Sequence, residues 1–353
     1  MDADQSTQLQ EQVRDACAEG RALRIQGGGS KAFYGREIRG EPLDMSGHRG
    51  LVHYQSSELV VSARAGTPLA EIEALLAQRN QFLPFEPPHF GVNATLGGAI
   101  ATGLSGPRRP YAGSARDFVL GVKILNGKGE VLKFGGEVMK NVAGFDVSRL
   151  MAGSLGTLGV LLEVSLKVLP RPTLEETRVF HCAPLDAIQR MSRWAGQPLP
   201  ITGAAYHGER LHVRLSGSAT GVQAAAQTLG GEILDGMDAF WQDLREQRLS
   251  FFDGDAPLWR LSLPPACPPL DLTGDWLIDW GGAQRWLRSN LPADRIRSAT
   301  QAAGGHATLF RGGDRLGEVF QPLSPALLRL HQQLKAAFDP QGIFNPGRLY
   351  AEF

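Results

Sequence analysis

Residues 25–35 read "IQGGGSKAFYG", in which three successive glycines follow a short apolar run and precede a serine and a lysine. Glycine permits positive φ and lacks the Cβ that would keep a ligand away from the main chain. Successive N–H groups in such a turn can converge on an anion, and the Ser30 hydroxyl adds a donor. The stretch fits neither the GxxxxGK[ST] phosphate loop nor a GxGxxG that opens a helix. An anion-binding loop and a ligand-free turn are therefore both open interpretations.

Glycine is also concentrated at two later positions in the chain. The sequence has 43 glycines among 353 residues, well above the usual fraction of about 7%. Residues 95–103 read "TLGGAIATG" and residues 151–160 read "MAGSLGTLGV". Each glycine in an ordered element costs about 0.5–1 kcal/mol relative to alanine. Three glycine-lined backbones therefore favour one large, flat ligand with a phosphate end.

The composition argues against several classes of protein. Lys+Arg and Asp+Glu both number 36, whereas a nucleic-acid binder normally carries a basic surplus. The three cysteines lie far apart and form no CxxC motif, so a local metal or iron–sulfur motif is missing. The polar N-terminus has no signal-peptide pattern, and no apolar run of about 18 residues occurs. We expect a cytoplasmic protein with no metal, no nucleic-acid partner and no transmembrane segment.

The hydrophobic pattern predicts an α+β protein. Helices are expected over 6–19, 68–80, 218–230 and 281–290, and from Pro325 onward with Ser324 as N-cap. Strands are expected over 22–26, 43–46, 160–170, 210–217 and 258–263. A hairpin is expected over 117–136, with Asn126 and Gly127 at its tip. The composition of the sequence changes after residue 170, where compact glycine motifs become few, which indicates a second α+β unit.

Five motifs in a fixed order carry a family resemblance. They are "GGGS", "TLGGAIATG", "YAGSARDFVLG", "KNVAGFDVSRLMAGSLGTLGV" and "FNPGRL". Together they resemble the FAD-binding fold of the vanillyl-alcohol-oxidase-like, or PCMH-type, flavoproteins, and more narrowly the FAD-binding subunits of bacterial glycolate oxidases. The resemblance implies a PCMH-type FAD-binding domain of two α+β subdomains at 1–172. It also implies a short α+β cap domain at 173–320 and a C-terminal segment at 321–353 that returns to the first domain.

The resemblance implies a set of residues for FAD. The first loop would wrap the diphosphate, the second segment would line the flavin and diphosphate path, and Ser114 and Asp117 would face the ribityl or ribose portion. The third segment would flank the adenine end, and the tail would return near the isoalloxazine ring. The residues concerned are Gly27, Gly28, Gly29, Ser30, Thr95, Gly97, Gly98, Ala99, Gly103, Ser114, Asp117, Gly153, Gly156, Gly159, Val160 and Asn345.

Departures from the family pattern shape the remaining expectations. Members that attach FAD covalently carry a histidine where Gly29 stands, so non-covalent FAD is expected. Phe145 stands where hydroxy-acid relatives usually show a tyrosine. The catalytic residues stay unknown, and His89, Arg109, His306 and Arg348 are weak candidates. For His89 loop packing is the alternative role, for Arg109 a solvated loop, and for the lone His306 a structural role.

The resemblance implies a subunit that helps to oxidise glycolate or similar 2-hydroxy acids to 2-oxo acids. FAD would pass electrons to partners, namely a sister FAD-containing catalytic subunit and an iron–sulfur subunit. The complex could be cytoplasmic or peripheral on the inner face of the membrane through those partners. The alternatives are a free-standing FAD-dependent 2-hydroxy-acid dehydrogenase, such as a D-lactate dehydrogenase, and a non-catalytic scaffold subunit.

Overall fold

The structure is a computed structural model that describes residues 3–136 and 146–353, apart from the side chains of 237 and 238. The chain forms two compact units. The first comprises residues 1–104, 114–170 and 315–353, and the second comprises 105–113 and 171–314. The expected domains at 1–172, 173–320 and 321–353 stay a prediction, from which this grouping differs by placing 105–113 in the second unit. Residues 140–145 of the "KNVAGFD" motif, with Phe145, lie outside the described residues.

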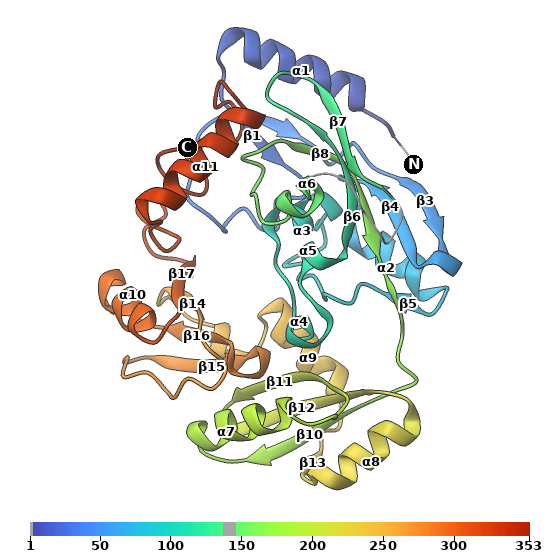
Figure 1. The fold of residues 1–353 in the computed structure, drawn as a ribbon, viewed down its shortest axis with the longest axis vertical. Coiled ribbons are helices and arrows are strands. Elements are labelled where there is room, and N and C mark those ends of the chain that lie inside the picture. Colours follow the sequence, from blue (N-terminus) through green and yellow to red (C-terminus); the bar gives the residue numbers. More distant parts are fainter. Residues whose placement is uncertain (1–2, 137–145) are drawn as a thin grey trace. The chain divides into compact units, whose positions relative to one another are not determined.

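The first unit mixes helices with antiparallel strands, as the α+β prediction requires (Figure 1). Its helices are α1 (Ser6–Glu19), η1 (Ser56–Glu58), α2 (Leu69–Ala77), α3 (Leu96–Thr102), α5 (Ala115–Phe118), α6 (Val147–Leu150) and α11 (Pro325–Phe338). Its strands are β1 (Leu23–Gln26), β2 (Glu41–Asp44), β3 (Leu51–Gln55), β4 (Val60–Arg64), β5 (Gln81–Phe82), β6 (Val119–Leu125), β7 (Val131–Gly135), β8 (Val160–Lys167) and β9 (Leu169–Pro170).

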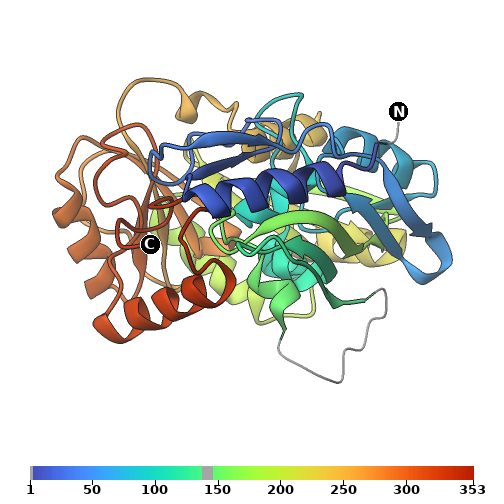
Figure 2. The ribbon, with the colours of Figure 1, turned by 90° about the horizontal axis from the view of Figure 1, so that it is seen from above.

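A five-stranded antiparallel sheet, in the order β3-β4-β8-β6-β7, forms the centre of this unit. Strands β6 and β7 are the predicted hairpin, closed by the turn that begins at Asn126. Helix α1 lies against this sheet (Figure 2) because Leu9, Val13 and Ala16 recur on one face and pack in one core with Val160 and other sheet residues. The periodicity of residues 6–19 thus correctly predicted both the helix and its buried face.

A separate parallel pair, β1 and β2, carries the glycine-rich loop at its end. The C-terminal tail joins this pair, because Leu23 and Phe344 form an isolated parallel bridge. Helix α11 begins as predicted, with the Ser324 hydroxyl accepting a hydrogen bond from the Leu327 N–H at 3.4 Å and Pro325 at the first helical position. The tail therefore returns to the first strand of the chain.

The second unit is built on one eight-stranded antiparallel sheet in the order β13-β10-β12-β11-β15-β16-β14-β17. Its strands are β10 (Leu174–His181), β11 (Ile201–His207), β12 (Arg210–Gly217), β13 (Glu232–Ile233), β14 (Leu258–Ser262), β15 (Asp275–Asp279), β16 (Gln284–Arg288) and β17 (His306–Arg311). Its helices are α4 (Arg109–Ala112), α7 (Pro184–Ala195), α8 (Ala219–Leu229), α9 (Met237–Glu246), η2 (Ser250–Phe252), η3 (Trp280–Gly282) and α10 (Ala293–Ala302).

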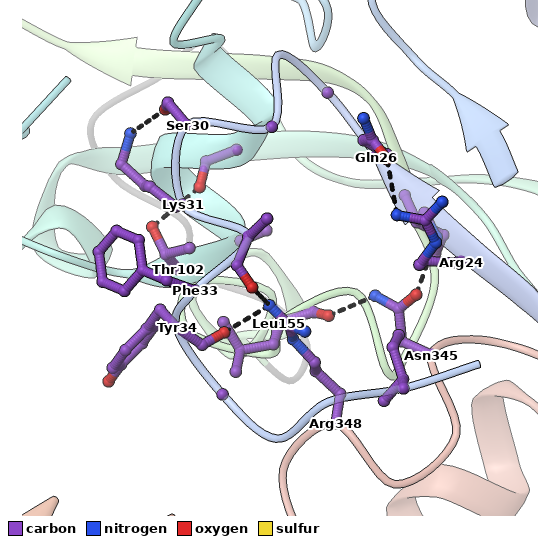
Figure 3. Close-up of a pocket in the computed structure, with 18 of the residues that line it drawn as sticks. Arg24, Gln26, Ser30, Lys31, Phe33, Tyr34, Thr102, Leu155, Asn345 and Arg348 are labelled. Atoms are coloured by element: carbon purple, nitrogen blue, oxygen red, sulfur yellow. Dashed lines mark hydrogen bonds between the residues drawn. The ribbon is translucent and has the colours of Figure 1, made fainter. Parts of the chain in front are cut away.

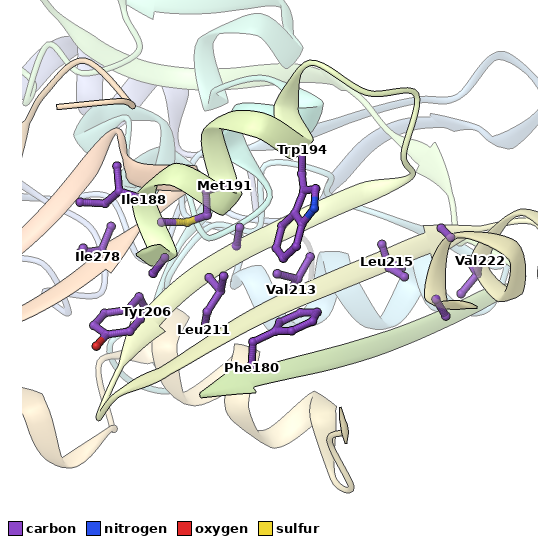
Figure 4. Packing of buried hydrophobic residues seen from close by; sticks show 14 residues of the cluster. Phe180, Ile188, Met191, Trp194, Tyr206, Leu211, Val213, Leu215, Val222 and Ile278 are labelled. Carbon is purple, nitrogen blue, oxygen red and sulfur yellow. The ribbon is translucent and has the colours of Figure 1, made fainter. Parts of the chain in front are cut away.

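The two halves of this sheet have the same strand order when each is read from its outer edge. The first half runs β10-α7-β11-β12-α8-β13, which is the split βαβ arrangement of a ferredoxin-like motif. The second half, β14-β15-β16-α10-β17, repeats the order from the other side, and β11 pairs with β15 where the halves meet. Helices α7 and α8 cover one face of the first half, where Ile188, Met191 and Trp194 pack onto Leu211 and Val213 (Figure 4).

One predicted helix in this unit is wrong. Residues 281–290 form a 3₁₀ turn and then strand β16, which pairs with both β14 and β15. Every side chain from Gln284 to Arg288 is buried, so both faces of the strand are covered and no alternation is visible in the sequence. Arg285 is only 1% exposed and donates to the carbonyls of Cys267 and Pro268 in the proline-rich segment that replaces the first helix of this half.

Candidate functional site

The first unit contains a cavity of about 460 Å³, within the range typical of ligand pockets. Residues 24–38 form one long wall, and residues of α3, Leu155 and the tail complete it (Figure 3). A second cavity of about 80 Å³ shares part of this wall and extends to Gly156 and Gly159. The three glycine clusters thus meet around adjoining cavities. The predicted residues that line them are Gly27, Gly28, Gly29, Ser30, Thr95, Gly97, Gly98, Gly156, Gly159, Asn345 and Arg348.

The main-chain amides of the first loop have the character of an anion site. Within the described residues, the N–H groups of Gly28, Gly29 and Ser30 donate to no protein acceptor. Gly29 has φ +72°, a conformation that favours glycine. Successive free amides on a cavity wall are the donors that a phosphate oxygen requires. The loop therefore fits a diphosphate better than it fits a ligand-free turn.

The glycines at 27 and 28 are required by the protein itself. A Cβ on Gly28 would lie 1.5 Å from the carbonyl oxygen of Asn93, and one on Gly27 would lie 2.5 Å from the Thr95 hydroxyl oxygen. The loop is pressed against the segment before α3, so these positions exclude side chains whether or not a ligand binds. Close packing therefore accounts for part of the glycine content that the sequence attributed to a ligand.

Helix α3 presents a smooth wall and few donors. Thr95 is its N-cap, and its hydroxyl oxygen accepts from the Gly98 N–H at 3.2 Å. The Gly97 N–H donates to the Ala65 carbonyl at 2.7 Å, and a Cβ there would meet the Ala65 Cβ at 2.7 Å. The helix N-terminus is thus occupied by protein acceptors. Its contribution to the cavity is a side-chain-poor surface on which a flat ring could lie.

Asn345 joins three separate segments at the cavity. Its side-chain oxygen accepts from the Ile25 N–H at 2.8 Å, and its Nδ2 donates to the Leu155 carbonyl at 2.7 Å. Its own N–H donates to the Leu23 carbonyl at 2.9 Å, and its φ is +40°. A Cβ on Gly156 would lie 2.7 Å from the Asn345 amide nitrogen. Asn345 therefore fixes the position of the third glycine cluster against β1.

Two arginines hold the second part of the loop through main-chain carbonyls. Arg348 donates to the carbonyls of Ala32 at 2.8 Å, of Arg36 at 2.9 Å and of Tyr34. Arg315 donates to the carbonyl of Phe33 at 2.7 Å and to that of Gly35. Burial, and then the charges of Arg315 and Arg24, lower the pKa of Arg348 to about 10. Both guanidinium groups therefore fix the main-chain conformation of residues 32–36.

The charge of the cavity wall is strongly positive. The lining includes five basic residues, namely Arg24, Lys31, Arg36, Arg315 and Arg348, and one carboxylate, which belongs to Glu37. Such a wall favours a ligand that carries at least two negative charges. Free amides, a smooth helical wall and excess positive charge together fit the diphosphate and ring system of FAD. Sequence reasoning missed the basic residues other than Arg348, although Arg24 and Lys31 directly flank "IQGGGS".

Six residues that the resemblance implied for FAD have other places in the structure. Ala99 and Val160 are buried in the core, and Gly103 ends α3 with φ +62° against Gly153. Ser114 and Asp117 form the capping box of α5, in which the Asp117 carboxylate accepts from the Ser114 N–H at 2.8 Å. None of the six lines either cavity. Their assignment to the cofactor stays a prediction without support from this geometry.

The weak catalytic candidates form no cluster within either unit. The His89 Nε2 lies 3.1 Å from a carboxylate oxygen of Glu73. In the second unit, the Arg109 guanidinium lies 4.3 Å from the centre of the Trp280 ring, and His306 begins β17 as an exposed residue. Arg348 lines the cavity, but its donors are directed at carbonyls. Within each unit, therefore, no base and cation among these four are brought together.

No three His, Cys, Asp or Glu side chains among the described residues are grouped so that they could hold a metal ion. No helix within residues 3–136 and 146–353 has the length and apolar character needed to cross a bilayer.

Comparison with known proteins gives a consistent picture. The FAD binding domain family matches residues 2–135, and the C-terminal domain of FAD linked oxidases matches residues 312–349. Glycolate oxidase subunit GlcE of Escherichia coli K12 is 53% identical over 99% of both chains. A D-lactate dehydrogenase of Archaeoglobus fulgidus is 26% identical over 74% of this chain and 71% of its own.

Structural similarity extends further than sequence identity. A structure of alkyldihydroxyacetonephosphate synthase superposes with a TM-score of 0.69 at 16% identity, covering 96% of this chain and 75% of that protein. At this identity the match concerns the fold alone.

The sequence matches show that the chain belongs to the family of FAD-linked oxidases that includes the glycolate oxidase subunit GlcE.

Proposed function

We propose that this chain is the FAD-binding subunit of a complex that oxidises glycolate, or a similar 2-hydroxy acid, to the 2-oxo acid. The observation that carries the proposal is the cavity whose lining combines the free amides of residues 28–30 with arginine and lysine side chains. The 53% identity to a glycolate oxidase subunit over nearly the whole of both chains supports the substrate class. The expected domain limits at residues 172 and 320 belong to the same proposal.

The residues of the chain would bind, orient and enclose the cofactor. The amides of Gly28, Gly29 and Ser30 would hold the diphosphate, and α3 would support the rings. Gly29 lacks an atom to which the flavin could be attached, so the FAD would be non-covalent. When bound, FAD supplies the two-electron acceptor for oxidation of the CH–OH group. The protein contributes position and electrostatic environment.

The lining of the cavity supports substrate oxidation at a partner subunit. Abstraction of a proton from a hydroxy acid needs a general base close to the flavin. The described residues that line the larger cavity include no histidine, and Glu37 is exposed at its edge. We therefore assign the main substrate site to a sister flavoprotein subunit.

Electrons would leave through an iron–sulfur partner. The three cysteines Cys17, Cys182 and Cys267 are free, and no metal-binding group occurs among the described residues. A cluster would therefore reside on another subunit. Attachment of the assembly to the inner face of the membrane would likewise depend on partners.

Purification of the chain alone and with its partners tests the proposal. The chain alone is expected to be yellow, to release its flavin into acid supernatant, and not to turn over glycolate with an artificial acceptor. Addition of the partner subunits should give turnover. A colourless chain after reconstitution with FAD would favour a scaffold subunit.

A free-standing dehydrogenase is the second candidate, and the D-lactate dehydrogenase relative favours it. Glycolate or D-lactate turnover by the isolated chain would establish it and contradict the proposed division of labour.

A further inference from the structure

The basic residues of the cavity differ in how their donors are used. Arg315 and Arg348 direct their guanidinium groups at the carbonyls of residues 32–36. Arg36 donates to the carbonyls of Gly317 and of Gly347, the latter at 3.0 Å. Lys31 donates to the carbonyl of His89 at 3.2 Å and to the Ser30 hydroxyl at 3.4 Å. These four residues are thus used to hold main chain in place.

Arg24 is used differently. It lies on β1 and lines the cavity. With the described part of the chain it makes a single side-chain hydrogen bond, from its Nη1 to the neutral Gln26 Oε1 at 2.9 Å. Among the described residues no carboxylate forms an ion pair with it. Figure 3 shows its side chain beside Gln26 and Asn345, at the end of β1 that leads into the glycine loop.

The group of positive charges here needs a counter-charge. Arg24 and Arg315 both act on Arg348 through like-charge repulsion. Three guanidinium groups around one cavity repel one another, and the single lining carboxylate, Glu37, is exposed. A bound dianion would remove this repulsion. Arg24, whose one hydrogen bond among the described residues uses Nη1, has donors left for such a ligand.

We propose that Arg24 binds the anionic diphosphate of the cofactor directly, whereas Arg315 and Arg348 are positioning residues that shape the loop. This inference rests on the proposed FAD site. It assigns the charge that complements the free amides of residues 28–30, since a guanidinium–phosphate contact is a charge-assisted and often bidentate hydrogen bond. Arg24 precedes the glycines by three residues and lies on a strand, so pairing with β2 fixes the position of its main chain.

The test compares Arg24→Gln with Arg24→Lys and with Arg21→Gln. Arg21 lies just before the same strand, is ion-paired with Glu19 and Glu41, and is absent from the cavity lining. The dissociation constant of FAD for the full chain is measured by fluorescence titration at low and high salt. We expect Arg24→Gln to weaken FAD by about 10- to 100-fold, with less salt dependence than the wild type. Arg24→Lys should recover part of the loss, and Arg21→Gln should change the constant less than about twofold.

The melting temperature without FAD separates binding from structure. Removal of one like charge should leave that temperature unchanged or raise it, whereas a structural role would lower it. Arg348→Lys is the opposite case, because loss of carbonyl contacts should lower the melting temperature of the apo chain. If Arg24→Gln binds FAD as the wild type does, or loses affinity only in proportion to lost stability, the assignment to Arg24 is wrong.

Inorganic pyrophosphate distinguishes this inference from the proposed function. Calorimetric titration with pyrophosphate alone should show binding to the wild type and weaker binding to Arg24→Gln. Pyrophosphate binding without FAD binding would contradict the proposed function but support the anion site at Arg24. FAD binding that is insensitive to Arg24 would support the proposed function and contradict the assignment of Arg24. A wild type that binds neither ligand would overturn both proposals.

Discussion

Replacement of Lys335 with methionine should destabilise the first unit strongly. The ammonium group is buried on α11 and donates to the Asp339 carboxylate at 2.7 Å, to the Thr157 carbonyl at 2.8 Å and to the Phe344 carbonyl at 2.7 Å. Burial lowers the pKa of Lys335, while the bonded Asp339 opposes that shift. Methionine would leave a fully buried carboxylate without its counter-charge. Breaking such a pair costs about 3–5 kcal/mol.

The expected change is large enough for a thermal scan. In a unit of this size, each kcal/mol lost from the free energy of unfolding lowers the melting temperature by about 2–4 °C, so Lys335→Met should lower that temperature by roughly 6–20 °C. Chemical denaturation followed by fluorescence should give the free energy directly. Arg329→Met, an exposed change on the same helix, serves as the control and should stay within about 0.5 kcal/mol of the wild type.

A second substitution tests the reason for the loss. Asp339 also accepts from the N–H groups of Ile343 at 3.1 Å and Phe344 at 2.7 Å. Asparagine keeps an acceptor there but removes the charge, so Lys335→Met combined with Asp339→Asn should recover part of the stability. A loss below about 1 kcal/mol in Lys335→Met, or no recovery in the double variant, would refute the buried ion pair as the cause.

Three further outcomes are expected. Gly28→Ala should abolish FAD binding and destabilise the chain more than Gly29→Ala does. The new Cβ at position 28 would meet the Asn93 oxygen, whereas alanine at position 29 would bear only the strain of a positive φ, about 1–2 kcal/mol. Equal effects of the two substitutions on FAD affinity and melting temperature would contradict this. Burial lowers the pKa of His212 to about 4. The unfolded chain therefore binds a proton at His212 at a higher pH than the folded chain does. The contribution of neutral His212 to the free energy of unfolding, at most about 3 kcal/mol, is thus present above pH 6.5 and lost as the pH falls from 6.5 to 4. His212→Phe should flatten the denaturation free energy across that window and the exposed control His181→Gln should not; an unchanged pH profile in His212→Phe would exclude this residue. FAD at a hundredfold excess over its dissociation constant should stabilise the chain by about 2.7 kcal/mol, and a melting temperature independent of FAD concentration would argue against binding to the folded state.

The sequence predicted best those features that depend on local pattern. The helix over 6–19, the hairpin of β6 and β7 and the cap at Ser324 each follow from neighbouring residues, and each is confirmed. The tip of the hairpin is longer than predicted, because the Asn126 N–H donates to the Glu130 carbonyl and places Asn126 at the base of the loop. Strand β16 was missed because a strand buried on both faces loses its alternation of polar and apolar residues.

The site was predicted in outline, since the three glycine clusters do meet. The contacts that build it could not be read from local pattern. Arg315 and Asn345 act on residues far away in sequence, and the clash between Gly28 and Asn93 appears only when two loops are packed together. The family resemblance supplied the cofactor, and the structure supplies the reasons for the positions of the basic residues.

The bond between Ile25 and Asn345 spans 320 residues of chain, and the bonds from Arg348 to the loop span about as many. Contacts of such separation raise the contact order, and closing so long a loop costs entropy before any contact rewards it. The cavity lined by residues 24–38 should therefore be among the last parts of the first unit to fold and the first to open under mild denaturant. We expect the local contacts of the hairpin and the helices to form earlier, so that the sheet is present before the cavity can accept a ligand.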